Sequence, residues 1–220
     1  MAYIGKSPAV AALTASDITD GIVSNAKLAQ DIISADTALA VTPATTDELL
    51  LSDAGTLKRI DYSVIAGVTE ADMWRLTANL TSSADPITSN LERVDDASFE
   101  KIGTGMSVSS GTWTFPSTGL WWVLINWGVE VASTADPYMY INYTTDNGGA
   151  WSQALKIYAG DRDGSTVKMN SSGHQFFNIT DISNDKLQIS VANANSNVTT
   201  MSASDRNWTY FTFIKLGDSQ

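Results

Sequence analysis

Carboxylate side chains are the groups of this chain that could take part in acid–base chemistry. Glycoside hydrolysis needs two carboxyl groups that flank one glycosidic bond. The candidates are Asp95 with Asp96, Asp161 with Asp163, and Glu130. Successive side chains of a strand point to opposite faces, so Asp95 and Asp96 are poorly placed to share a site. Glu130 stands between two valines and is expected to face solvent or a boundary between subunits. We therefore expect no enzyme activity.

Metal and cofactor chemistry finds equally little support in the sequence. The single histidine, His174, has no partner at the spacing of a catalytic triad or a zinc site, and we expect it at the surface. The segment Asp161–Gly164, which reads DRDG, loosely resembles a calcium loop. It lacks the third oxygen ligand, and Ser172 stands where that loop needs a glutamate. We expect neither a metal ion nor a cofactor.

Tryptophan rings could instead stack on sugars, but their alternation in one long strand favours a structural role. Trp121, Val123 and Trp127 share one face of this strand, and Trp122 shares the other face with Leu124. A strand that is apolar on both faces is buried on both sides. One face is expected to lie in a core and the other in a subunit interface. The candidates for core or interface are Trp121, Trp122, Val123, Trp127, Tyr210, Phe211 and Phe213.

Polar loops are the remaining candidates for ligand contact. Gly148 and Gly149 make a turn possible close to Trp151, which is expected to be the most exposed tryptophan. The candidate receptor contacts are Asp146, Asn147, Trp151, Asp161 and Asp163.

Composition excludes several classes of partner. The 220 residues carry a net charge of −11 without a cluster of lysine or arginine, which disfavours nucleic acid and anionic membranes as partners. The absence of cysteine excludes disulfides and thiolate chemistry. No apolar run is long enough for a transmembrane helix, and the N-terminus lacks the pattern of a signal peptide. We expect no insertion into a membrane.

Aromatic residues divide the chain into three parts. All tryptophans and phenylalanines lie beyond residue 67, so residues 1–67 are interpreted as an attachment arm, 68–97 as a neck, and 98–220 as a head. Within the arm, Asp17–Ala40 is compatible with either a helix or short strands. Asp47–Ile60 predicts a hairpin whose turn is at Asp53 to Gly55.

The head shows the pattern of short strands separated by turns, which indicates a mainly β fold, a sandwich or jelly roll. Ala71–Leu80 could be a short helix or strand, and a polar loop is expected over Asp161–Ser172. The expected strands of the head are Phe99–Ile102, Met106–Val108, Thr112–Phe115, Leu120–Val131, Tyr138–Thr144, Trp151–Tyr158, Gln175–Ile179, Lys186–Val191 and Asn207–Leu216.

The first long strand carries a resemblance to a known superfamily. Its residues are Trp113-x5-Gly119-Leu120-Trp121-Trp122-Val123. This pattern resembles the aromatic-x5-Gly-x-Tyr-x-Phe signature of the complement one-q and tumour necrosis factor superfamily. The final strand, WTYFTFIKLG, is also similar to that of these heads. The resemblance implies a jelly-roll head that forms a tight homotrimer and binds proteins or glycans.

The arm carries a second resemblance. The segments DGIVSNAKLAQDI and DELLLSDAGTLKRIDYSVI are similar to segments of bacteriophage tail fibres and other virion appendages. This resemblance implies a structural virion protein, assembled in the host cytoplasm, with residues 1–67 bound to other virion proteins and the head bound to a host surface glycan or protein. Capsid decoration, as a head fibre, is the alternative. A surface-polysaccharide depolymerase is the second alternative.

Overall fold

The computed structural model describes residues 43, 44, 46–54, 56–62, 67–94, 99–132, 136–160, 166–192 and 196–220. The chain divides into two compact units, Met1–Val64 and Ile65–Gln220. The predicted helix or strands of Asp17–Ala40 lie outside the described residues.

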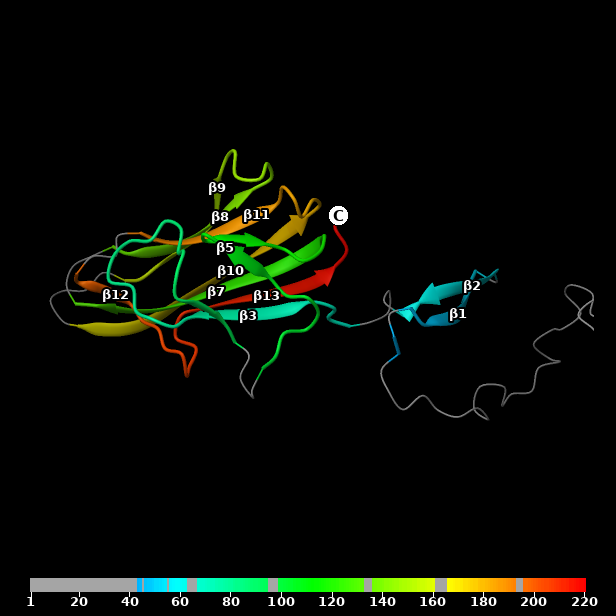
Figure 1. The fold of residues 1–220 in the computed structure, drawn as a ribbon, viewed down its shortest axis with the longest axis horizontal. Helices are drawn as coiled ribbons and strands as arrows, with labels where there is room; N and C mark the ends of the chain where they lie inside the picture. Colours follow the sequence, from blue (N-terminus) through cyan, green and yellow to red (C-terminus); the bar gives the residue numbers. More distant parts are fainter. Residues whose placement is uncertain are drawn as a thin grey trace, which may run out of the picture. The chain divides into compact units, whose positions relative to one another are not determined.

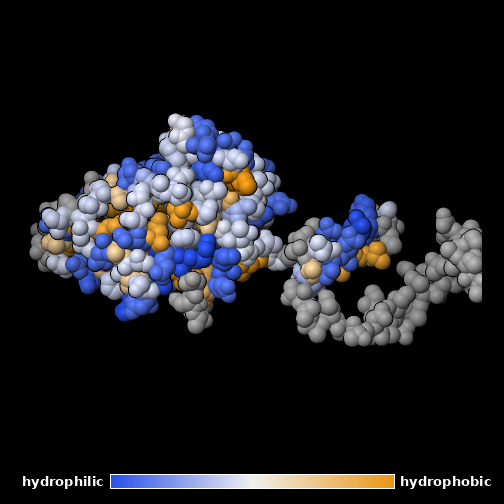
Figure 2. Space-filling model, in the orientation of Figure 1, coloured by the Kyte–Doolittle hydropathy of each residue, from blue (hydrophilic) through white to orange (hydrophobic). Residues whose placement is uncertain are grey.

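The described part of the first unit is a β-hairpin. Strands β1 (Glu48–Asp53) and β2 (Thr56–Asp61) pair antiparallel, which confirms the hairpin that the sequence predicts. The leucines of β1 are exposed, Leu50 to 76%. Figure 2 shows hydrophobic residues at the surface of this hairpin. An isolated two-stranded hairpin is marginally stable in water.

The second unit is a sandwich of two antiparallel sheets (Figure 1). The first sheet has the order β10-β7-β13-β3-β4, with β12 also paired to β7. Its strands are β3 (Ala71–Leu76), β4 (Leu91–Arg93), β7 (Gly119–Val131), β10 (Val167–Ile179), β12 (Val198–Thr200) and β13 (Tyr210–Gly217). The second sheet has the order β5-β6-β11-β8-β9. Its strands are β5 (Ser107–Ser109), β6 (Thr112–Thr114), β8 (Tyr138–Thr144), β9 (Ser152–Tyr158) and β11 (Lys186–Ala192).

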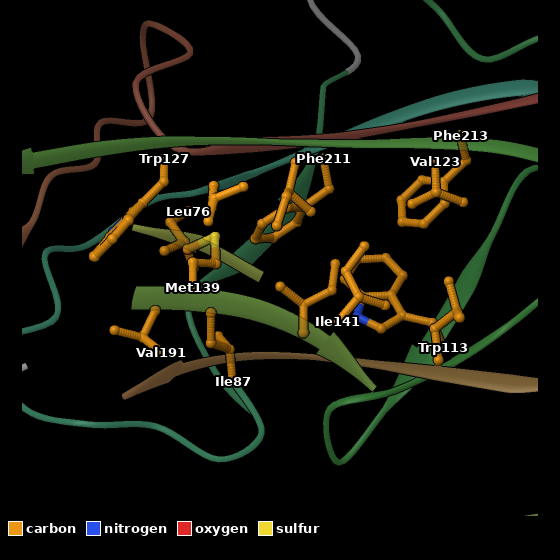
Figure 3. Close-up of a cluster of buried hydrophobic side chains, with 14 of the residues drawn as sticks. Leu76, Ile87, Trp113, Val123, Trp127, Met139, Ile141, Val191, Phe211 and Phe213 are labelled. Atoms are coloured by element: carbon orange, nitrogen blue, oxygen red, sulfur yellow. The ribbon is translucent and has the colours of Figure 1, made fainter. Parts of the chain in front are cut away.

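Large aromatic side chains from both sheets fill the space between the layers (Figure 3). Trp113 of β6 lies at the centre of an aromatic group: its ring centroid is 5.2 Å from that of Trp74, 5.1 Å from that of Phe213 and 6.0 Å from that of Phe211. Offset and edge-to-face geometries of this kind add to the stabilisation that burial alone provides. The core therefore joins β6 of the second sheet to β3 and β13 of the first.

The sandwich begins earlier than the sequence predicts. The neck expected over residues 68–97 contains β3 and β4, and β3 pairs with β13 in the middle of the first sheet. The segment Ala71–Leu80, ambiguous in sequence, is therefore a strand over Ala71–Leu76. This strand contains the charged residues Asp72 and Arg75, so its sequence does not show the apolar pattern of a buried strand.

Those charges are paired inside the fold. Asp72 is only 1% exposed, and its carboxylate accepts hydrogen bonds from the Met106 backbone at 2.8 Å, the Trp74 indole at 2.8 Å and the Arg93 guanidinium at 3.0 Å. A buried carboxylate is tolerated when it is paired and its oxygens are satisfied. This network ties β3 to β4 and to the segment before β5.

Two other expectations differ from the structure. The polar loop expected over Asp161–Ser172 contains the first part of β10, which begins at Val167 and pairs with β7 along its whole length. The outward side chains of this part of β10 are exposed and polar. In the sequence, this composition resembles that of a loop. The strand expected at Phe99–Ile102 is reduced to one isolated bridge between Ile102 and Ala71.

Tyr143 couples the stability of the sandwich to alkaline pH. Burial, followed by the negative charge of Asp185, raises the pKa of Tyr143 to about 12, and its hydroxyl donates to Asp185 Oδ1 at 3.1 Å. Between the ordinary tyrosine pKa of about 10 and that value of about 12, the folded chain holds a proton that the unfolded chain has lost. The free energy of unfolding is thus expected to fall as pH rises through this window. Below the window Tyr143 is protonated in both states, and it gives the free energy of unfolding no pH dependence there.

Urea unfolding at several pH values checks this expectation. The Tyr143→Phe variant should show a smaller loss of stability between about pH 10 and 12, and the difference between the two proteins at pH 8 serves as the baseline. Equal alkaline slopes for variant and wild type would contradict the assignment.

Candidate functional site

The alternation of β7 divides the predicted core-or-interface residues into two groups. Trp121, Val123 and Trp127 point between the sheets and are fully buried. Phe211 and Phe213 of β13 join them there. Trp122 and Tyr210 instead lie on the outer face of the first sheet, half-buried. Most of the predicted set therefore builds the core, and only these last two residues remain available for an interface.

An apolar surface surrounds Trp122 on this outer face. Opposite residues of antiparallel neighbours share a face, and the register places Phe176 of β10 and Ile214 of β13 on either side of Trp122. The next row holds His174 and Leu124. We name this surface the outer patch; its members are Trp122, Leu124, His174, Phe176 and Ile214.

Aromatic rings hold the outer patch together. The His174 ring lies 5.9 Å from the Trp122 ring and 6.1 Å from the Phe176 ring, measured between centroids. Phe176 is 51% exposed, and Trp122, Leu124 and Ile214 are half-buried. Exposed apolar patches that are continuous and rimmed by polar residues mark surfaces of interaction. The outer face of β7 is thus apolar and partly exposed at Trp122 and Leu124, while Asn126 and Glu130 make the rest of this face polar.

The candidate contact residues between β8 and β9 form a closed turn. The Asp146 carboxylate accepts from the Thr144 hydroxyl at 2.5 Å and from the Ala150 backbone at 2.9 Å. These bonds, the one from Thr144 first, lower the pKa of Asp146. Asn147 adopts a positive φ of 57° and donates its backbone N–H to Asn184. The Asp146 carboxylate therefore stabilises the turn, and Asn147 is exposed.

Trp151 lies against this turn and is half-buried. Gly148 has a φ of 94°, and a Cβ atom added there would lie 3.5 Å from the Trp151 ring. The other candidate contacts, Asp161 and Asp163, lie outside the described residues, as do Asp95 and Asp96.

The remaining candidates for chemistry are dispersed over the sandwich. His174 is exposed within the outer patch, and Glu130 lies at the far end of β7, where Lys168 Nζ is 3.4 Å from its carboxylate. Within the part of the chain that the structure describes, no three histidine, aspartate or glutamate side chains lie close enough to hold a metal ion. The described residues also contain no helix of the length and apolarity that crossing a membrane requires.

A cluster of tyrosines on the second sheet is the surface that sequence reasoning did not identify. Tyr138 and Tyr140 of β8 share its outer face with Lys156 and Tyr158 of β9. The alternation in the segment YMYINYT signals two of these residues. The pairing of β8 with β9 brings the other two beside them, and this pairing is visible only in the structure.

Comparisons with known proteins support the fold but no specific function. No protein-family model matches the chain, and no curated protein matches its sequence. Among solved structures, Eiger TNF from S. frugiperda is similar with a TM-score of 0.51 and 9% identity, over 68% of this chain and 94% of that one. Murine APRIL at pH 8.5 is similar with a TM-score of 0.47 and 12% identity, over 67% of this chain and 98% of that one. Together with the strand order, the likeness to Eiger TNF shows that the sandwich is a TNF-like jelly roll.

Proposed function

We propose that this chain is a homotrimeric structural protein of a bacteriophage particle, a tail fibre or spike whose sandwich binds a component of the host surface. The outer patch supports the assembly in this proposal, because it presents aromatic and aliphatic side chains on the face of β7 opposite the core. The resemblance of the arm to virion appendages supports the placement in a virion. Residues 1–67 would attach to other virion proteins.

Burial of the outer patch supplies the driving force for assembly. A large aromatic side chain removes about 150–250 Å² from water when it is fully buried, at roughly 25 cal/mol per Å². Trp122 and Phe176 are only partly covered in one chain. Completing their burial in three copies contributes on the order of several kcal/mol. The superfamily that the sequence resembles implies three-fold assembly.

Three heads on one particle appendage explain how weak sites suffice for attachment. Once one site is occupied, the other two sites are held near the host surface, where their effective concentration is high. The combined affinity therefore exceeds that of a single site. No catalytic step is required, and we propose that the protein is not an enzyme. Its binding therefore depends on assembly.

Sedimentation velocity tests the assembly. The full chain at micromolar concentration is expected to sediment as a species of about 71 kDa, three times the chain mass of 23.6 kDa. A 23.6 kDa monomer under these conditions would overturn the trimer.

Imaging of phage particles that carry a label on this protein tests the placement. Label at the tail supports the fibre or spike. Label spread over the capsid would indicate decoration of the capsid instead, and release of reducing sugar from host capsule would contradict the absence of enzyme activity.

A further inference from the structure

The outer face of the second sheet carries a compact group of aromatic rings. Tyr138 lies opposite Tyr158 and Tyr140 lies opposite Lys156 in the register of β8 and β9. The Tyr138 ring centroid is 5.7 Å from that of Tyr158 and 5.6 Å from that of Tyr140. We name these four residues the tyrosine face.

Lys156 lies across these rings. Its ammonium nitrogen is 4.0 Å from the Tyr138 ring centroid and 5.6 Å from that of Tyr158. The attraction between an ammonium group and an aromatic ring holds the lysine side chain in place. The tyrosine face therefore presents one oriented cationic donor beside an exposed ring, since Tyr158 is 53% exposed.

Hydrogen bonds hold the Tyr140 end of the tyrosine face against the neighbouring segment of the chain. Tyr140 is nearly buried, and burial followed by a hydrogen bond with Asp85 raises its pKa. The Ser190 hydroxyl donates to the same carboxylate at 2.8 Å. Backbone hydrogen bonds between Ala84 and Val191 hold this segment against β11. Tyr140 is therefore held in position beside Tyr138.

We propose that the tyrosine face binds a neutral pyranose unit of a surface glycan, with the sugar ring stacked on Tyr158 and its hydroxyls bound by Lys156 and the phenol groups. This inference rests on the proposed role of the trimer as a binding head. A pyranose ring has one face of C–H groups that packs on an aromatic ring, while its hydroxyls need polar partners.

Size and charge favour this ligand over two others. A stable protein partner covers about 800 Å² on each side, and three tyrosines offer at most about 150–250 Å² each, of which Tyr140 is already nearly buried. The face is thus matched to one or two sugar rings. The net charge of −11 disfavours a polyanionic glycan, whereas a neutral one experiences no such repulsion.

The position of the tyrosine face is compatible with assembly through the outer patch. The two surfaces lie on different sheets, and the outer faces of two stacked sheets point in opposite directions. A trimer built on the outer patch therefore leaves three copies of the tyrosine face in solvent. Each can bind weakly and still contribute to attachment.

Saturation-transfer NMR on the full chain with neutral hexasaccharides tests the site. The probes are maltohexaose, cellohexaose and chitohexaose, with hexagalacturonate as the acidic comparison. At least one neutral probe is expected to bind with a dissociation constant near about 1 mM per site, and hexagalacturonate more weakly. Tyr158→Ala should weaken binding about tenfold and Tyr158→Phe much less, because phenylalanine keeps the stacking ring. Lys156→Gln should weaken it about threefold or more.

Lys168→Gln is the matched control. Lys168 also lies near an aromatic ring, 5.7 Å from that of Trp208, but on the first sheet, so this variant makes the same charge change elsewhere and should bind like the wild type. No binding of any neutral probe at about 10 mM, stronger binding of hexagalacturonate, or unchanged binding by Tyr158→Ala would each overturn the inference. Sedimentation of the same samples reports assembly separately, so a trimer without sugar binding refutes the tyrosine face and leaves the trimer standing.

Discussion

Replacing Trp122 with glutamate should convert the trimer into folded monomers. The side chain points away from the core and lies between Phe176 and Ile214 on the outer patch. A carboxylate that is desolvated without a partner costs several kcal/mol, and a three-fold assembly would have to bury three of them. The monomer keeps its core because Trp121 and Val123, on either side in sequence, face the other way.

Sedimentation velocity measures this change, and near-ultraviolet circular dichroism confirms that the aromatic core is intact. Gln153→Glu is the matched control, because it adds the same charge at an exposed position of β9 in the second sheet. It should remain trimeric. If Trp122→Glu also remained trimeric, the outer patch would not be the interface. If it failed to fold, Phe176→Glu at a more exposed position repeats the test.

Replacing Trp113 with alanine should cause the largest loss of stability in the sandwich. Its ring is 1% exposed and touches Trp74, Phe211 and Phe213. Truncation of a buried tryptophan to alanine costs about 3–5 kcal/mol, because the aromatic contacts are lost and a cavity remains. That is a large share of the roughly 5–15 kcal/mol that stabilises a typical domain.

Urea unfolding in the Trp122→Glu background measures the loss as a unimolecular quantity, since the stability of an oligomer depends on concentration. Trp208→Ala is the control. Trp208 is partly exposed, so this variant should lose much less stability. A Trp113→Ala protein as stable as this control would show that the ring is not central to the core. If the Trp122 variant is itself trimeric, the comparison is made at one protein concentration.

Alternation made several strands predictable. The segment YMYINYT is β8 with the predicted bounds, and the apolar run from Leu120 to Val131 is β7 to within one residue. Strands with buried charges or polar outer faces were not predictable in this way. Asp72 and Arg75 conceal β3, because their partners come from distant segments. The first part of β10 reads as a loop, because its outward residues are polar.

The two candidate binding surfaces were likewise predictable only in part. A period of two shows that β7 has two apolar faces, and it assigns Trp121 and Trp122 to opposite ones. It does not show which face meets the second sheet, since that depends on the long-range pairing of β7 with β10 and β13. The tyrosine face depends in the same way on β8 meeting β9, and the pairing of Asp146 with its own loop removes a carboxylate that the sequence offers to a ligand.

The sequence by itself determined that this protein is a β sandwich with an aromatic core and a hairpin in its arm. These features follow from local alternation and turn residues. Only the tertiary structure decided which aromatic residues are buried, which form the outer patch and which form the tyrosine face. The physical reason is that a side chain's exposure depends on the strands and sheet that pack against it, and these come from distant parts of the chain.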